Sequence, residues 1–115
     1  MSNVSCSWVK VALSGAAISA RRFASSITYG SRTFLFGGQT SSRLFHADLF
    51  AFDGNAKTVE LLAPTGEGPS PRASHSATLV GNEMYVYGGL FMKQALGDMY
   101  VLNLGTLTLS WLPRR

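Results

Sequence analysis

Three apolar residues that run directly into two glycines occur twice in this chain, at residues 34–38 (FLFGG) and residues 85–89 (YVYGG). The outer two apolar residues are aromatic in both copies, and each run is too short for a helix. Each copy therefore predicts a β-strand that is buried on both faces. Paired glycines allow a backbone with positive φ and the close approach of a neighbouring strand or loop. We therefore predict four structural glycines where the strands turn into loops: Gly37, Gly38, Gly88 and Gly89.

Further landmarks recur at a nearly fixed distance along the chain. Arg21 and Arg72 lie 51 residues apart, and the same shift superposes Ser25 on Ser76 and Gly30 on Gly81. Beyond the paired glycines the shift becomes 50, which places residues 48–53 (DLFAFD) on residues 98–103 (DMYVLN). A period near 50 residues is typical of repeat architectures, in which each repeat is one supersecondary unit.

Each repeat predicts four short strands. They are expected at residues 25–29, 34–36, 48–52 and 59–62 in the first repeat, and at residues 76–80, 85–87, 98–102 and 109–112 in the second. Gly-Ser, Gly-Asn and Asp-Gly-Asn sequences mark turns between them. The predicted fold is all-β, with a four-stranded antiparallel meander that occurs twice.

These motifs resemble kelch repeats, which are the blades of one class of β-propeller. In the second copy the resemblance rests on Arg72, His75, Ser76, Gly81, residues 85–89, residues 98–102 and Trp111. The first copy departs from the family pattern at Ala24, which replaces the histidine, and at Val59 or Leu61, which replaces the fourth-strand tryptophan. Trp8, in a short strand predicted at residues 8–11, resembles the fourth-strand tryptophan of a preceding blade. The resemblance implies packing roles for Arg21, Arg72, His75, Trp8 and Trp111.

The resemblance also organises the chain and sets a blade count. The expected segments are an outer strand around Trp8 within residues 1–20, a first repeat at 21–62, an inter-blade loop at 63–71, a second repeat at 72–112 and a basic tail at 113–115. Closed propellers have roughly four to eight blades, whereas this chain supplies two and a leading strand. We therefore predict that further blades or self-association close the propeller. The alternative is a fragment or remnant of a longer kelch protein with no independent activity.

The predicted function is a non-catalytic protein-interaction module that binds a partner through loops on one propeller face. In a meander, the loops after the second and fourth strands emerge at the same end. Loops on a rigid scaffold commonly carry recognition, and aromatic, Met and Arg side chains are favoured interface anchors. The candidate partner-binding residues follow the two second strands: Arg43, Phe45, His46, Phe91, Met92, Lys93 and Gln94. The alternative for Phe45 and Phe91 is that they only cap the edges of their blades.

We predict no catalytic residue, no metal and no cofactor. His46 and Asp48 could be combined with a serine on paper, but no nucleophile elbow accompanies them. Two histidines and one distant cysteine do not supply the three or four converging ligands of a metal site. The paired glycines lack the sequence context of a phosphate-binding loop. The alternative is that the propeller supports an enzyme site located in missing blades.

The net charge of +4 is unevenly distributed, because the first 47 residues contain five Lys or Arg and no Asp or Glu. Such a segment resembles a mitochondrial transit peptide in composition, unless its residues belong to the fold with solvated charges. The single cysteine, Cys6, suits a reducing compartment, so we expect a cytoplasmic protein, with a mitochondrial location as the alternative. No stretch approaches the ~20 apolar residues that cross a bilayer, and the isolated basic pairs do not predict a nucleic-acid partner.

Overall fold

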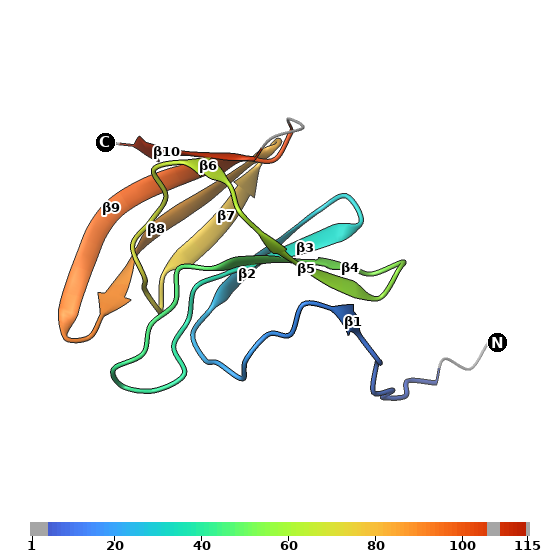
Figure 1. The fold of residues 1–115 in the computed structure, drawn as a ribbon. Helices are drawn as coiled ribbons and strands as arrows, with labels where there is room; N and C mark the ends of the chain where they lie inside the picture. The colour runs from blue at the N-terminus through green and yellow to red at the C-terminus, as the bar shows by residue number, and fades with distance from the viewer. Residues whose placement is uncertain (1–4, 106–108, 115) are drawn as a thin grey trace.

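In the computed structural model, which describes residues 5–105 and 109–114, the two repeats form two separate β-sheets and no described residue lies in a helix. The first repeat contains β2 (Ser25–Tyr29), β3 (Arg32–Phe36), β4 (Leu49–Asp53) and β5 (Thr58–Leu62). The second contains β7 (Ser76–Val80), β8 (Glu83–Phe91), β9 (Gln94–Asn103) and β10 (Ser110–Arg114). Consecutive strands pair antiparallel within each repeat, which confirms the predicted all-β fold (Figure 1).

Each sheet also carries a fifth strand of two residues that the sequence did not predict. β1 (Ser14–Gly15) pairs in parallel with β5, and β6 (Thr65–Gly66) pairs in parallel with β10. Both glycines have positive φ, and a Cβ placed on either would lie 2.2 or 2.3 Å from a carbonyl oxygen of the paired strand. Only glycine allows the connection into each blade to run this close to the outer strand.

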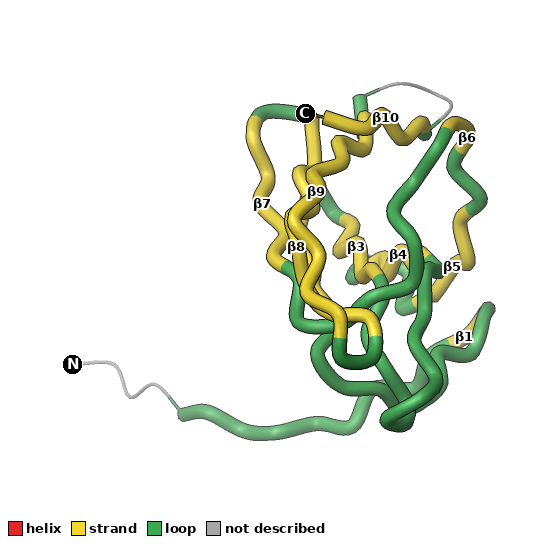
Figure 2. Tube along the Cα trace, turned by 90° about the vertical axis from the view of Figure 1, so that its left-hand side faces the viewer, coloured by secondary structure: helices red, strands yellow, loops and turns green. Residues whose placement is uncertain are grey.

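The strand predicted at residues 8–11 is not formed. Those residues lie outside every strand, and the Trp8 side chain is fully exposed. Residues 5–13 run away from both sheets as an extended stretch (Figure 2). A fourth strand needs the third strand of its own blade as a hydrogen-bonding partner, and the described part of the chain contains no such third strand for residues 8–11.

The core lies between the two sheets, where one face of the first blade packs on one face of the second. Eight of its members are at most 5% exposed, and a ninth, Leu104, is 8% exposed. The eight are Phe34, Phe36, Leu49 and Ala51 from the first blade, and Met84, Val86, Leu102 and Trp111 from the second. The rings of Phe36 and Trp111 meet edge to face with their centroids 5.4 Å apart. Full burial of one large apolar side chain contributes roughly 1.5–3 kcal/mol, so this shared core is the main attraction between the blades.

Hydrogen bonds between the two blades reinforce the core. Three of them join backbone groups across the interface: Gly38 N–H to the Arg72 carbonyl (2.9 Å), Arg72 N–H to the His46 carbonyl (3.1 Å) and Ser74 N–H to the Phe23 carbonyl (2.9 Å). A fourth runs from the ring Nε2 of His75 to the carbonyl oxygen of Phe36, at 3.0 Å. These directional bonds fix how one blade sits against the next.

The structure places Trp111 at the repeat position of Val59 and not of Leu61. Trp111 lies opposite Leu102, and Val59 lies opposite Phe52, which is the repeat equivalent of Leu102. The connection into β10 is longer than the connection into β5, so the shift at this strand becomes 52 residues. Val59 and Leu61 lie two residues apart and therefore on the same face of the strand. The greater length of the connection into β10 places Trp111 at the position of Val59.

Basic residues of the acid-free first segment pair with carboxylates that come later in the chain. Arg21 contacts Asp48 at 2.5 Å, and Arg32 contacts Glu60 at 2.8 Å. These two arginines therefore belong to the fold. The Arg21 side chain is largely buried in its pair, whereas the Arg32–Glu60 pair is exposed and its charges remain solvated. Within residues 5–105 and 109–114 there is no helix that is long and apolar enough to cross a membrane.

Candidate functional site

Segments of both blades meet at one end of the molecule and enclose a hollow. The loop between β3 and β4 lies beside the far end of the β8–β9 hairpin (Figures 1 and 2). A cavity of about 570 Å³ lies between them and is lined by Gln39, Ser42, Arg43 and Phe45 from the loop, and by Leu90, Met92 and Lys93 from the hairpin. We call this cavity the blade-end hollow.

The hairpin side of the hollow differs from the prediction. Residues 90–97 were expected to form a loop, but strand pairing resumes after a register shift between Tyr87 and Gly89. Leu90 then lies opposite Ala95, and only Met92 and Lys93 form the turn. A bulge lets the ladder restart with a stronger twist, so this side of the hollow is a paired arm that projects beyond its blade.

Two aromatic rings connect the loop to the arm. The ring centroids of Phe45 and Phe91 lie 5.4 Å apart with their planes inclined by 59°, which is a favourable geometry for an aromatic pair. Phe45 is buried and also lines the hollow. It therefore packs against the neighbouring blade and supplies apolar surface to the hollow at the same time.

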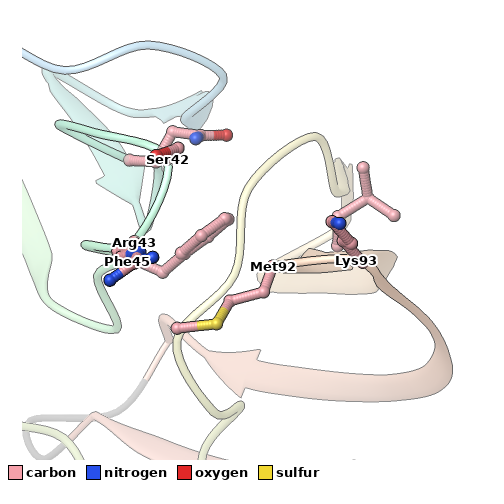
Figure 3. A pocket seen from close by; sticks show the side chains of 7 residues that line it. Ser42, Arg43, Phe45, Met92 and Lys93 are labelled. Atoms are coloured by element: carbon pink, nitrogen blue, oxygen red, sulfur yellow. The ribbon is translucent and has the colours of Figure 1, made fainter.

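The hollow combines an apolar interior with positive charge. Phe45, Leu90 and Met92 supply apolar surface, whereas Arg43 and Lys93 bring one cation from each blade. Figure 3 shows Arg43 and Phe45 on one side and Met92 and Lys93 on the other, with the Met92 side chain reaching across the gap. No acidic residue lines the hollow, and among the described residues neither cation forms a salt bridge.

The remaining candidate residues lie beside the hollow without lining it. His46 holds the loop through its backbone, because its N–H donates to the Gly38 carbonyl at 2.9 Å and its own carbonyl accepts from Arg72. Its ring Nε2 lies 3.4 Å from the hydroxyl oxygen of Thr40. Phe91 does not line the hollow but packs against Phe45, which does, and Gln94 is exposed opposite Phe91 in the ladder.

Sequence reasoning did not single out three of the lining residues: Gln39, Ser42 and Leu90. All three lie in the two segments that were expected to follow the second strands. Gln39 and Leu90 directly follow the paired glycines. Their position next to the strand ends could therefore have identified them as candidate lining residues. Ser42 carried no such signal, because its position depends on how the loop folds back.

Each blade is held at this end by a buried arginine that uses all five of its N–H donors. The Arg72 guanidinium is completely buried and donates to both carboxylate oxygens of Asp98 (2.6 and 3.1 Å), to the Gly88 carbonyl (3.1 Å) and to the carbonyl and hydroxyl oxygens of Ser70 (3.0 and 3.1 Å). These bonds from Arg72 hold the pKa of Asp98 below its ordinary value.

The first blade repeats the same arrangement around Arg21. Its guanidinium donates to Asp48, to the Gly37 carbonyl and to the carbonyl and hydroxyl oxygens of Ser19. Asp48 is therefore occupied by an arginine, and the combination of His46 and Asp48 considered on paper has no support in this geometry. No group of three or more His, Cys, Asp or Glu side chains that could hold a metal occurs among the described residues.

His75 is a buried, uncharged histidine at the junction of the blades. Its Nε2 donates to the Phe36 carbonyl, while its buried Nδ1 has no hydrogen-bond partner among the described residues. Burial lowers the pKa of His75 from 6.5 to about 4, with a smaller contribution from the positive charge of Arg72, and the bond to Phe36 opposes this shift. The ring is therefore neutral in the folded chain near pH 7.

This histidine predicts a loss of stability in mild acid. Because its folded pKa lies below its unfolded value, the unfolded chain binds more protons between pH 6.5 and pH 4. The free energy of unfolding should therefore fall as the pH falls through this window, by about 3 kcal/mol in total at about 1.4 kcal/mol per pKa unit. Urea titrations at a series of pH values would measure this slope.

His75→Gln is the matched variant for this measurement, because a glutamine amide can donate to the same carbonyl but does not titrate. Its unfolding free energy should depend much less on pH between 6.5 and 4 than that of the unmodified chain. Equal slopes for the two proteins would show that another group causes the acid sensitivity.

Comparisons with known proteins place the chain among kelch-repeat proteins. It is 35% identical over 103 residues to "Rab9 effector protein with kelch motifs" from Danio rerio, an alignment covering 87% of this chain and 29% of that protein. It is 32% identical over 104 residues to "Leucine-zipper-like transcriptional regulator 1 homolog" from Drosophila melanogaster, covering 85% of this chain and 11% of that protein. It is 41% identical over 59 residues to "Host cell factor 1" from Homo sapiens, an alignment that covers 51% of this chain and 3% of that protein.

The chain therefore spans less than a third of the length of these curated relatives. A family model described as the KLHDC2/KLHL20/DRC7 Kelch-repeats domain matches residues 1–114. The motifs, the two meander blades and these matches agree, and the chain belongs to the kelch-repeat family.

Proposed function

We propose that this chain is a protein-interaction module that binds an acidic, partly apolar segment of a partner protein in the blade-end hollow. The observation that carries the proposal is the composition of the hollow, in which Arg43 and Lys93 flank an apolar interior and none of the described lining residues is a carboxylate. Concave sites with an apolar lining and a few placed polar groups are the usual binding sites of proteins.

Charge complementarity selects the chemistry of the partner. Two cations that face one hollow repel each other unless an anion lies between them, and an Asp or Glu side chain supplies that anion. Met92 is flexible, and the rings of Phe45 and Phe91 offer a large rigid surface, so the same hollow suits an apolar side chain next to the acidic one.

The kelch-repeat relatives support an interaction role at a coarser level, since one of them is described as an effector protein. The partners of those proteins do not transfer to this chain, which covers only part of their length. The proposed ligand class therefore rests on the chemistry of the hollow.

A peptide selection followed by charge reversal tests this function. Random 12-residue peptides displayed on phage would be selected on the chain, and the enriched sequences should combine Asp or Glu with Leu, Met or an aromatic residue. Reversing both cations with Arg43→Glu and Lys93→Glu should weaken the binding of a selected, fluorescein-labelled peptide by about 10- to 100-fold in anisotropy titrations.

The matched control carries the same change in net charge away from the hollow. Lys10→Glu and Lys57→Glu both alter exposed residues that do not line the hollow and, like the test pair, lower the net charge of +4 to zero. The control should bind the peptide within about twofold of the unmodified chain, and far-ultraviolet circular dichroism should show all three proteins folded. Unchanged affinity of the Arg43→Glu and Lys93→Glu protein would remove the hollow from consideration.

A further inference from the structure

The turn at the end of the β8–β9 arm holds a methionine in a backbone conformation that favours glycine. Phe91 pairs with Gln94, so the turn consists of two residues, Met92 and Lys93. Met92 has a φ of 56°, and Lys93 does not have a positive φ. A positive φ at the first of two turn residues is the pattern of a type II′ turn, in which glycine usually takes that position. Met92 therefore strains the turn, because its Cβ disfavours the left-handed region.

The side chain of Met92 returns little packing to the fold. It is 49% exposed, whereas Met84 in the core is completely buried. It lines the blade-end hollow, and Figure 3 shows it reaching across the gap between the two sides. Residues in sparsely populated backbone conformations cluster at binding and catalytic sites, where the strain serves function. The place of Met92 in the hollow indicates that its side chain contacts a bound partner.

A thioether differs from the other apolar groups of the hollow, because mild oxidants convert it into a polar group. The apolar lining consists of Phe45, Leu90 and Met92. Hydrogen peroxide transfers one oxygen atom to a thioether sulfur. The S–O bond forms as the O–O bond breaks, the sulfur loses two electrons, and the reduced peroxide leaves as water. The product, methionine sulfoxide, is polar and accepts hydrogen bonds.

Met92 is the most accessible methionine within residues 5–105 and 109–114. Met84 is completely buried, and Met99 is only partly exposed because it pairs with neighbouring strands on both sides. Peroxide must reach the sulfur to react, so Met92 should be oxidised before either of them. The exposed thiol of Cys6 is a second oxidisable group, far from the hollow in sequence.

We propose that Met92 is an oxidation site that controls partner binding, and that its conversion to the sulfoxide releases the partner. This inference rests on the proposed function, in which the partner is an acidic, partly apolar segment. The sulfoxide removes apolar surface from the hollow, so an apolar side chain of the partner would bury a polar group. Its oxygen also competes with the partner's carboxylate for Arg43 and Lys93, the two cations of the same hollow.

The oxidation is reversible by known chemistry. Methionine sulfoxide reductases return the sulfoxide to the thioether. They do so at the expense of two thiols, which become a disulfide while the oxygen leaves as water. One reductase acts on each of the two sulfoxide epimers, so both are needed for full recovery. Reversible oxidation would link partner binding to the level of peroxide around the protein.

Peroxide treatment tests the oxidation site. A Cys6→Ser chain, which lacks the exposed thiol, would be oxidised with hydrogen peroxide, desalted and titrated with a selected peptide that contains no Met or Cys. Peptide mapping by mass spectrometry should find Met92 oxidised and Met84 intact. The affinity should fall at least 10-fold with an unchanged far-ultraviolet circular dichroism spectrum. Both reductases with dithiothreitol should restore the affinity to within about twofold.

Met92→Leu is the matched variant for this treatment, because leucine keeps the apolar volume and every other methionine remains. It should bind the peptide within about threefold of the unmodified chain and should not respond to peroxide. An equal loss in this variant would show that another residue causes the effect. Unchanged affinity of a chain oxidised at Met92, or oxidation of Met84 before Met92, would also overturn the proposal.

Met92→Gly tests whether the strained side chain serves binding and not the fold. Glycine adopts a φ of 56° without strain, so the melting temperature should rise by about 3–6 °C. The peptide should bind at least 5-fold more weakly, because the contact with the thioether is lost. A fall in both melting temperature and affinity would show that Met92 supports the fold, which would contradict the proposal.

Lys57→Gly is the control for the release of strain. Lys57 has a φ of 57° in the turn between β4 and β5 and does not line the hollow. In a meander this turn and the loop between β3 and β4 lie at opposite ends of the blade. The variant should also raise the melting temperature but should bind the peptide within about twofold of the unmodified chain.

The outcomes distinguish this proposal from the proposed function. A peptide whose binding depends on Arg43 and Lys93 but not on the oxidation of Met92 would keep the hollow as the binding site and overturn only the oxidation site. If no peptide is enriched, or if the charge-reversed chain binds as tightly as the unmodified one, both proposals are wrong.

Discussion

Replacing Arg72 with methionine should lower the free energy of unfolding by about 3 kcal/mol. The guanidinium is completely buried, and its loss leaves the buried carbonyl of Gly88 without this donor, whereas Ser70 is exposed and water can replace the donor to its carbonyl. Each unsatisfied buried polar group costs roughly 1–3 kcal/mol. Asp98 adds less, because 44% of its side chain is exposed and water can replace the arginine.

Thermal and urea denaturation would measure this effect, with an expected fall in melting temperature of roughly 10–15 °C. Arg32→Met is the matched control, because it removes an arginine from an exposed pair with Glu60, and such pairs contribute about 0–1 kcal/mol. The Arg72→Lys variant distinguishes the contribution of the positive charge from that of the planar guanidinium with its five N–H donors. A lysine that restores full stability would contradict the role given to the five N–H donors, since lysine keeps the charge but lacks the planar fork.

Replacing Gly37 with alanine should destabilise the chain by about 2–4 kcal/mol. A φ of 70° costs a residue with a Cβ roughly 1–2 kcal/mol. The added Cβ would also lie 2.8 Å from the Arg72 carbonyl oxygen and 2.8 Å from the ring of His75. The first of these is backbone of the adjacent blade and the second is a buried ring, so the blades must separate slightly to make room, which is the usual cost of overpacking.

Gly88→Ala is the internal control for this substitution. Gly88 has almost the same φ, and its nearest obstacle is the Leu96 carbonyl at 3.1 Å, which small shifts of the hairpin can accommodate. We expect this variant to lose about 1–2 kcal/mol, the part that comes from backbone strain. Equal losses for the two variants in urea titrations would show that the close approach of the blades at Gly37 contributes nothing.

The repeat in the sequence was sufficient to predict the fold of each blade. Alternating apolar residues, aromatic strands and turn glycines at fixed offsets specify a four-stranded meander, because strand formation and hairpin turns depend mainly on local sequence. The strands β2 and β7 begin and end at the predicted residues. The two-residue strands β1 and β6 were missed, because so short a pairing leaves no alternation to read.

The blade-end hollow was only partly predictable. The meander rule places the segments after the second strands at one end, and Arg43, Phe45 and Lys93 do meet there. The length of the β8–β9 arm was not predicted, because it depends on a bulge that restarts the ladder after Tyr87. Gln39, Ser42 and Leu90 were not singled out, since their contribution depends on the relative position of two blades.

By itself, the sequence determined the family, the four-stranded meander of each blade and the arginine and glycine positions that recur in both. Only the tertiary structure decided that residues 8–11 stay unpaired, that Trp111 takes the position of Val59, and which cations share one hollow. The physical reason is that strand and turn preferences act over a few neighbouring residues. The contacts between blades join residues about 50 positions apart, and their geometry is set by packing and hydrogen bonds across the interface.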